Sequence, residues 1–368
     1  MKPLKKHIGI LISILTLLYG CVEEIGLVTE AEFNSALVIE ATITNELKRQ
    51  EIKLSRVYRL ESDGPSPENG AEVNVISSDG NQYVFQAGNE AGVYVSNSSF
   101  AAQPNIDYHL EVTTSDGRQY SSGIQQLTPS VPIDDLYVER NFNENNEEGV
   151  SIFVDASTSN TIPIFYRYEY EETYKVIAPL YSPLELVILN DDFDYPPNFF
   201  ASNTVQEIMD FFFLLQSRPE QEQVCYNTVK SNRVILGNTE DLIGNNVDRF
   251  RVRFIGRENY IMSHRYSILV RQYVQSQAAN AYYSTLAQFA NSESVFTENQ
   301  PGFLEGNVFS TSNEAEMVVG FFEVSAVDEK RVYFNYADVF PGEQLPPYVV
   351  ECDDFFSPIL LKEDFAHN

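Results

Sequence analysis

One cysteine near the amino terminus has the most clearly defined chemistry in this chain. Cys21 follows a basic segment, Met1–His7, and an apolar run of 11 residues, Ile8–Leu18. A basic segment, a short apolar run and a small residue before the cut are typical of a secretory signal. The apolar run is too short to cross a bilayer, which takes about 20 residues. We therefore expect residues 1–20 to be a signal peptide.

The residues around the cut indicate what happens to this cysteine. Leu18-Tyr19-Gly20-Cys21 resembles the bacterial lipobox, although Tyr19 is bulkier than the usual residue. The resemblance implies cleavage before Cys21, a diacylglycerol on its sulfur and an acyl chain on its amine. Each buried CH₂ contributes about 0.8 kcal/mol, so two or three chains form a firm anchor. The alternative is an ordinary signal peptide with a coincidental cysteine.

Two acidic residues follow the anchor. Glu23 and Glu24 resemble the export signal that sends lipoproteins of Bacteroidota to the outer face of the outer membrane. The alternative is an accidental pair in an acidic chain. We expect residues 21–34 to be a tether at the outer membrane. Display on the cell surface is favoured, and a periplasm-facing position is the other possibility.

The remaining cysteines form a possible bridge. Beyond Cys21 the chain holds only Cys225 and Cys352, which lie 127 residues apart. In an oxidising compartment an even pair predicts a disulfide. Closing so long a loop contributes about 4–5 kcal/mol in the chain-entropy model. The alternative is two unrelated buried thiols.

Other chemistry is weakly indicated. The carboxylates of Asp191, Asp192 and Asp194 are a calcium candidate, but they lack the spacing of an EF-hand, and a solvated acidic turn is the alternative. The sequence has no nucleophile elbow, no His-Glu-x-x-His motif and no phosphate-binding glycine loop. We expect no catalytic residue, no other metal site and no cofactor.

The charge excludes one class of partner. The chain carries 24 basic and 53 acidic residues, for a net charge of −29. Nucleic-acid binding needs clustered Lys and Arg, so we exclude it. Anionic lipid head groups would also repel the chain, which leaves the lipid to hold it at the membrane.

Alternating apolar patterns predict a mainly β fold. The chain has 22 Tyr and 25 Phe and no Trp, and aromatic enrichment favours sheets. Strands are expected at residues 36–43 and 51–58, and Ser-Asp-Gly turns at 78–80 and 115–117 predict two hairpins. About seven strands in 100 residues predict an immunoglobulin-like β-sandwich for residues 35–130.

A proline-spaced connector at residues 127–133 marks the expected boundary with a larger β-rich domain, residues 131–368. This domain should hold one or two short helices, at residues 205–216 and after an N-cap at Ser276. Apolar residues of the second helix should lie on a sheet.

Two strands carry opposite charges. Residues 164–174 place three tyrosines on one face and charged residues on the other, and residues 249–254 present three arginines on one face. We expect these strands to be neighbours joined by a Glu–Arg ladder. The alternative is that the arginines capture an acidic ligand. The residues concerned are Tyr166, Tyr168, Tyr170, Arg167, Glu169, Glu171, Arg249, Arg251 and Arg253.

Several motifs appear in a characteristic order. In chain order they are Leu37–Thr44, the paired Ser-Asp-Gly hairpins, Arg167-Tyr168, Tyr282-Tyr283, Pro301–Val308 and Val318–Phe322. Together they resemble the domain-of-unknown-function 4249 family over nearly all of the exported chain. The resemblance implies a Bacteroidota envelope lipoprotein, a kind often accompanied by TonB-dependent receptors. The family often ends in Cys-x-x-Cys, whereas only Cys352 is present here, and it has no established catalytic residues.

These observations lead to one functional expectation. We expect an outer-membrane lipoprotein that is a non-catalytic binding or accessory module beside a TonB-dependent transporter. An adhesive or structural surface protein is the alternative, and a hydrolase with an unrecognised site is a third reading.

Overall fold

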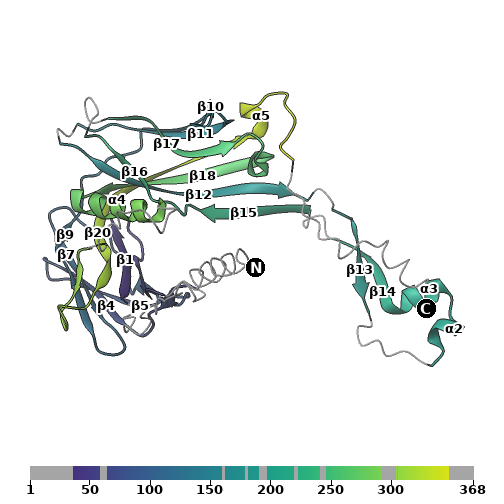
Figure 1. Ribbon diagram of the computed structural model, residues 1–368, viewed down its shortest axis with the longest axis horizontal. Coiled ribbons are helices and arrows are strands. Elements are labelled where there is room, and N and C mark those ends of the chain that lie inside the picture. Colours follow the sequence, from purple (N-terminus) through teal and green to yellow (C-terminus); the bar gives the residue numbers. More distant parts are fainter. Residues whose placement is uncertain are drawn as a thin grey trace, which may run out of the picture.

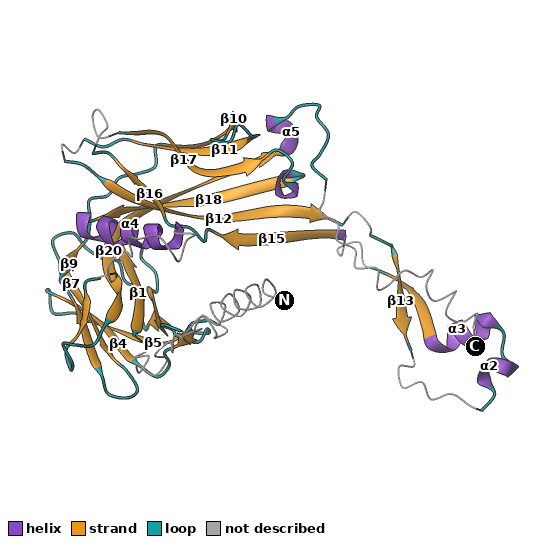
Figure 2. Cartoon of the chain, viewed as in Figure 1, coloured by secondary structure: helices purple, strands orange, loops and turns teal. Residues whose placement is uncertain are grey.

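The computed structural model describes residues 36–58, 64–159, 162–178, 181–189, 197–218, 223–240, 246–291, 304 and 306–347. Cys21, Glu23, Glu24, Cys352 and the three aspartates of the calcium candidate lie outside these residues. Among the described helices, none has the length and apolar character to cross a bilayer. The fold is mainly β, as the sequence predicts (Figures 1 and 2).

One long open sheet runs through the molecule, in the order β15-β12-β18-β20-β1-β2-β6-β5-β4-β7-β8-β19. Its first strands are β1 (Leu37–Thr44), β2 (Glu51–Arg56), β3 (Ser66–Pro67), β4 (Glu72–Ser77), β5 (Gln82–Ala87), β6 (Val93–Ser96), β7 (Asp107–Thr113), β8 (Gln119–Ser122) and β9 (Gln125–Gln126). Its later strands are β12 (Phe165–Ile177), β15 (Val224–Lys230), β16 (Ile235–Asn238), β18 (Arg265–Gln275), β19 (Val308–Ser310) and β20 (Val318–Asn335).

Both predicted hairpins are confirmed, as β4–β5 and β7–β8. Gly80 and Gly117 adopt φ values of 92° and 86°, which glycine reaches without steric cost. In each turn the aspartate accepts a hydrogen bond from a hydroxyl two residues earlier: Asp79 from Ser77, and Asp116 from Thr114. The repeated sequence therefore builds the same turn twice.

Strand β20 joins two hydrophobic cores. Residues 318–325 pair with β1 in parallel, and residues 326–335 pair with β18 in antiparallel register. The first core lies among β1 to β8, with Val308 of β19 and Phe322 of β20. The second lies between the long sheet and a three-stranded sheet, β10 (Asp135–Phe142), β11 (Glu148–Ala156) and β17 (Val247–Gly256).

The immunoglobulin-like layout is not confirmed. The sheets are open, and the first core is completed by β19 and by the first half of β20, which come from more than 170 residues later in the chain. The domain boundary near residue 130 stays a prediction.

The predicted Glu–Arg ladder is wrong in its pairing. Strands β12 and β17 belong to different sheets, so they are not hydrogen-bonded neighbours. Arg253 does bind a glutamate of β12, but it is Glu172, at 3.1 Å. Glu172 has the inward parity of the tyrosines, so this ion pair bridges the space between the two sheets. Arg249 and Arg251 bind Glu139 and Glu144 instead.

Strands β12 and β15 extend beyond the rest of the long sheet as an arm, and a small lobe follows at its end (Figure 1). The lobe holds β13 (Leu184–Ile188), α2 (Phe199–Ser202), α3 (Val205–Phe212) and β14 (Phe213–Ser217). The helix predicted at 205–216 therefore ends early. Phe213 turns to extended backbone, and Leu215 lies on a strand, not on the helix face.

Two short elements and one longer helix complete the description: η3 (Tyr260–Met262), α5 (Tyr336–Val339) and the longer α4 (Gln277–Asn291). Strand β18 starts at Arg265, directly after η3 and the two residues that follow it. Helix α4 lies across the long sheet (Figure 2). Ser276 caps it as predicted, since its hydroxyl accepts a hydrogen bond from the Ala279 amide at 3.1 Å.

Candidate functional site

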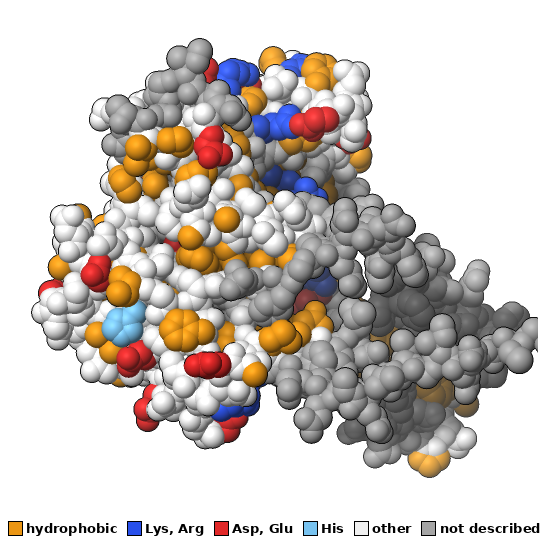
Figure 3. Space-filling view, turned by 60° about the vertical axis from the view of Figure 1, so that its left-hand side comes forward, with side chains coloured by type: hydrophobic (Ala, Val, Ile, Leu, Met, Phe, Trp, Pro, Cys, Tyr) orange, Lys and Arg blue, Asp and Glu red, His pale blue; other side chains and the backbone are white. Residues whose placement is uncertain are grey.

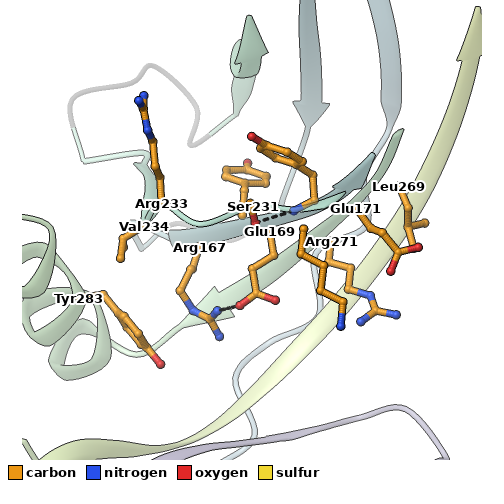
Figure 4. A pocket seen from close by; sticks show the side chains of 12 residues that line it. Arg167, Glu169, Glu171, Ser231, Arg233, Val234, Leu269, Arg271 and Tyr283 are labelled. Atoms are coloured by element: carbon orange, nitrogen blue, oxygen red, sulfur yellow. Dashed lines mark hydrogen bonds and ion pairs between the residues drawn. The ribbon is translucent and has the colours of Figure 1, made fainter. Parts of the chain in front are cut away.

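A pocket of about 350 Å³ opens where α4 meets the long sheet (Figure 4). Strands β12, β15 and β18, the chain after β15 and helix α4 all contribute to it. The lining residues are Arg167, Tyr168, Glu169, Tyr170, Glu171, Lys230, Ser231, Arg233, Val234, Leu269, Arg271 and Tyr283.

Strand alternation places the charged groups of this pocket. On β12 the even-numbered tyrosines face the second core, where Tyr166 and Tyr168 are buried, so the odd-numbered charged residues face outward. Register then sets Glu169 opposite Arg271 of β18 and Glu171 opposite Lys230 of β15. Three adjacent strands thus deliver charges of both signs to one surface.

Arg167 is the buried centre of this surface. Only 7% of the residue is exposed, and its Nη2 lies 3.2 Å from Oε2 of Glu323, which is 1% exposed. Its guanidinium also binds Glu169, toward which it points in Figure 4. The rings of Tyr273 and Tyr283 lie 4.3 and 4.8 Å from it, a double cation–π contact.

Electrostatics keep Arg167 charged. Burial on its own lowers the pKa of Arg167, but the neighbouring ionisable groups, the carboxylates of Glu323 and Glu169 among them, more than offset this, and the pKa is raised. Burial raises the pKa of Tyr283 to about 12, so this phenol is neutral at physiological pH. Two buried polar atoms, Nε of Arg167 and Oε1 of Glu323, have no hydrogen-bond partner among the described residues.

Helix α4 holds Tyr283 over the pocket. Its apolar face packs on the sheet as predicted: Ala279 and Tyr282 are buried against Phe321 of β20. The Tyr282 and Phe321 rings are 5.5 Å apart. Because this contact fixes the helix, the next residue, Tyr283, is directed at the Arg167 guanidinium.

The lining of the pocket holds more basic than acidic side chains. Four basic and two acidic side chains line it, a sum of +2 in a chain of −29. Arg271 is bound to Glu329 at 2.9 Å, whereas Lys230 and Arg233 make no ion pair with any described residue. Figure 4 shows Arg233 pointing away from Arg167. Lys230 is therefore the cation available to a ligand beside Arg167.

This chemistry is suited to binding. The pocket offers guanidinium, ammonium, carboxylate and phenol groups, which together can hold a small polar ligand that bears an anionic group. Within the described residues no group of three His, Cys, Asp or Glu side chains could hold a metal ion. Burial lowers the pKa of His264, and this residue does not line the pocket.

Among the described residues, Cys225 is the one member of the predicted lipidation, disulfide and calcium sites, and it does not line this pocket. Cys225 is exposed on β15, and no disulfide joins it to any described residue. Its predicted partner Cys352 lies outside the described residues, so the bridge stays a prediction. The arginines of β17 make ion pairs within the protein, and Figure 3 likewise shows basic side chains beside acidic ones at several points.

Arg167, the centre of the pocket, was recognised in the sequence only as a member of a charged stripe. The rings of Tyr273 and Tyr283 cover Arg167, but the sequence shows this only once it is known that the three segments that carry these residues meet in the fold.

Comparison with known proteins places the chain in a family. None of the curated proteins compared with it matches. One family model, described as a domain of unknown function (DUF4249), matches residues 22–331. That stretch includes the pocket, the arm, the first core and most of the second core, which extends to Phe334, Tyr336 and Phe340. The chain therefore belongs to the DUF4249 family.

Proposed function

We propose that this protein is a lipid-anchored, non-catalytic binding module of the outer membrane, working beside a TonB-dependent transporter at the cell surface. The signal sequence, Cys21 and the Glu23-Glu24 pair support the location. The pocket beside Arg167 is the observation that carries the binding role. It combines fixed charges of both signs with two cations, Lys230 and Arg233, that have no ion-pair partner among the described residues, and Arg233 points away from Arg167 (Figure 4).

The partner is tested by extraction and co-purification. Membranes are dissolved in mild detergent and the protein is isolated with whatever remains bound. A β-barrel receptor recovered in a fixed ratio supports the transport role. A soluble or matrix partner recovered instead contradicts it and favours adhesion.

The pocket is tested by charge reversal. Lys230→Glu places a carboxylate beside Glu171 and should abolish binding of an anionic ligand that is retained by the extracted protein in native mass spectrometry. Lys53→Glu is the matched control, since Lys53 is also an exposed strand lysine, far from the pocket residues in the sheet order. Equal retention by both variants contradicts a role for the pocket.

A further inference from the structure

The lobe at the end of the arm, called here the distal lobe (residues 181–189 and 197–218), is the most apolar surface of the described chain. Nine of its large apolar side chains are exposed: Leu184, Leu186, Ile188, Leu189, Phe200, Val205, Met209, Leu214 and Leu215. Five phenylalanines, Phe199, Phe200, Phe211, Phe212 and Phe213, pack against one another, yet of these only Phe212 is buried. The lobe thus leaves most of the large apolar side chains among its described residues in contact with solvent.

One face of the lobe's sheet is apolar and uncovered. Register pairs Leu186 with Leu215 and Ile188 with Phe213, so these side chains share a face with Leu184. Leu186 is 47% exposed, and Ile188 and Leu215 are each 61% exposed. Strands β13 and β14 pair only with each other among the described residues. A two-stranded sheet is marginal in water by itself, so this one needs a further element.

The described chain ends beside the arm that carries this lobe. The hydroxyl of Ser263 donates a hydrogen bond to the carbonyl of Pro346 at 3.1 Å. Ser263 follows η3, where the ring of Tyr260 contacts Tyr174 of β12 at 5.9 Å. Tyr174 in turn lies opposite Asn227 of β15. Pro346 therefore lies at the base of the arm, and the description of the chain ends at the next residue, Pro347.

The 21 residues that follow, 348–368, include apolar side chains of the kind that would cover the exposed face of the lobe's sheet. They include the apolar residues Phe355, Phe356, Ile359, Leu360 and Leu361. An extended chain spans about 3.3 Å per residue, so 21 residues could reach about 70 Å. Length therefore does not limit access to the lobe.

Cys225 lies on the arm, within the reach of this segment. It is exposed and lies opposite Val176, one position from the end of the β12–β15 ladder and next to the lobe. Tyr174 and Val176 are about 7 Å apart along the strand. Cys352, six residues after Pro346, has a reach of about 20 Å, which covers this distance.

We propose that residues 348–368 dock on the apolar face formed by Leu184, Leu186, Ile188 and Leu215, and that a Cys225–Cys352 disulfide fixes them to the arm. This inference does not depend on the proposed function. It assigns the occupant of the face to the same polypeptide, in contrast to a membrane, a second copy or another protein.

The experiment compares hydrogen exchange in the lipidated full-length protein with a variant that ends at Pro347. The truncation should speed amide exchange in β13 and β14 at least tenfold and leave β18 unchanged. Unchanged exchange in β13 and β14 overturns the proposal. Peptide mapping without reduction should recover Cys225 joined to Cys352 of the same chain, and a link between two chains also overturns it.

A second variant keeps the inference testable if the shortened chain does not fold. Leu215→Ser removes a side chain from the centre of the proposed contact and should speed exchange throughout residues 353–361. Leu47→Ser is the matched control, because Leu47 is an exposed leucine outside the lobe, at 78%. Equal exchange of residues 353–361 in the two variants contradicts the docking.

Discussion

The ion pair between Arg167 and Glu323 gives the sharpest test of how the pocket is held together. Glu323→Gln keeps the shape of the side chain and removes its charge, which leaves the Arg167 guanidinium buried with only Glu169 as an acidic partner. At 3.2 Å and an effective dielectric constant of about 20, the two charges attract by about 5 kcal/mol. Removing one partner of a buried pair typically costs about 3–5 kcal/mol.

We therefore expect Glu323→Gln to lower the free energy of unfolding by about 3–5 kcal/mol. Urea unfolding followed by circular dichroism measures this, since the chain has no tryptophan to report on folding. Glu169→Gln is the matched control: the Glu169 side chain is 45% exposed, so water screens its carboxylate, and we expect its loss to cost under about 1 kcal/mol.

A double variant separates charge from packing. Arg167→Met combined with Glu323→Leu removes both charges together and should recover most of the stability lost in Glu323→Gln, because neither charge is then left buried alone. A loss below about 1 kcal/mol in Glu323→Gln, or equal losses in Glu323→Gln and Glu169→Gln, would refute the reasoning.

Three further predictions concern stability. Burial raises the pKa of Tyr120 and of Tyr166 to about 12, whereas an unfolded tyrosine has a pKa of about 10. Each therefore contributes stability below pH 10 that is lost between pH 10 and 12, and alkaline unfolding of Tyr→Phe variants checks this. Gly320→Ala should lower the free energy of unfolding by about 3 kcal/mol or prevent folding, since φ is +142° and a Cβ would lie 2.2 Å from a carbonyl oxygen. Gly256→Ala is the control: its added Cβ meets nothing within 4 Å, so the thermal midpoint should change little. Ser276→Ala removes the cap of α4 and should cost about 1 kcal/mol, measured by thermal unfolding.

The hairpins and the aromatic face could be predicted because their causes are local. An Asp-Gly turn fixes its own backbone, and alternation along β12 alone decides that Tyr166 and Tyr168 point to one side. Helix α4 was equally predictable, since Ser276 and the apolar spacing after it belong to one segment.

The pairing of charges could not be predicted in the same way. Arg253 was expected opposite Glu169 or Glu171, on the outward face of a neighbouring strand. It binds Glu172 because the two strands lie in different sheets, and only an inward-facing carboxylate can meet it across the space between them. Strand order depends on contacts between distant segments, which the pattern of a single segment does not contain.

The pocket was missed for the same reason. Arg167 and Glu323 are 156 residues apart in sequence and meet only because β18 pairs with both β12 and β20. The early end of α3 has a different cause. Apolar spacing continues to Leu215, but Phe213 leaves the helix to pair with Ile188, so tertiary pairing overrides the local helical pattern.

Lipid attachment at Cys21 is the claim on which the proposed location and role depend, and the intact mass of the mature protein tests it most directly. We predict a chain that starts at Cys21 and carries a diacylglyceryl group and an amide-linked acyl chain, while Cys21→Ser leaves the membrane fraction. An unmodified amino terminus, or a Cys21→Ser variant that still sediments with membranes, would contradict the account.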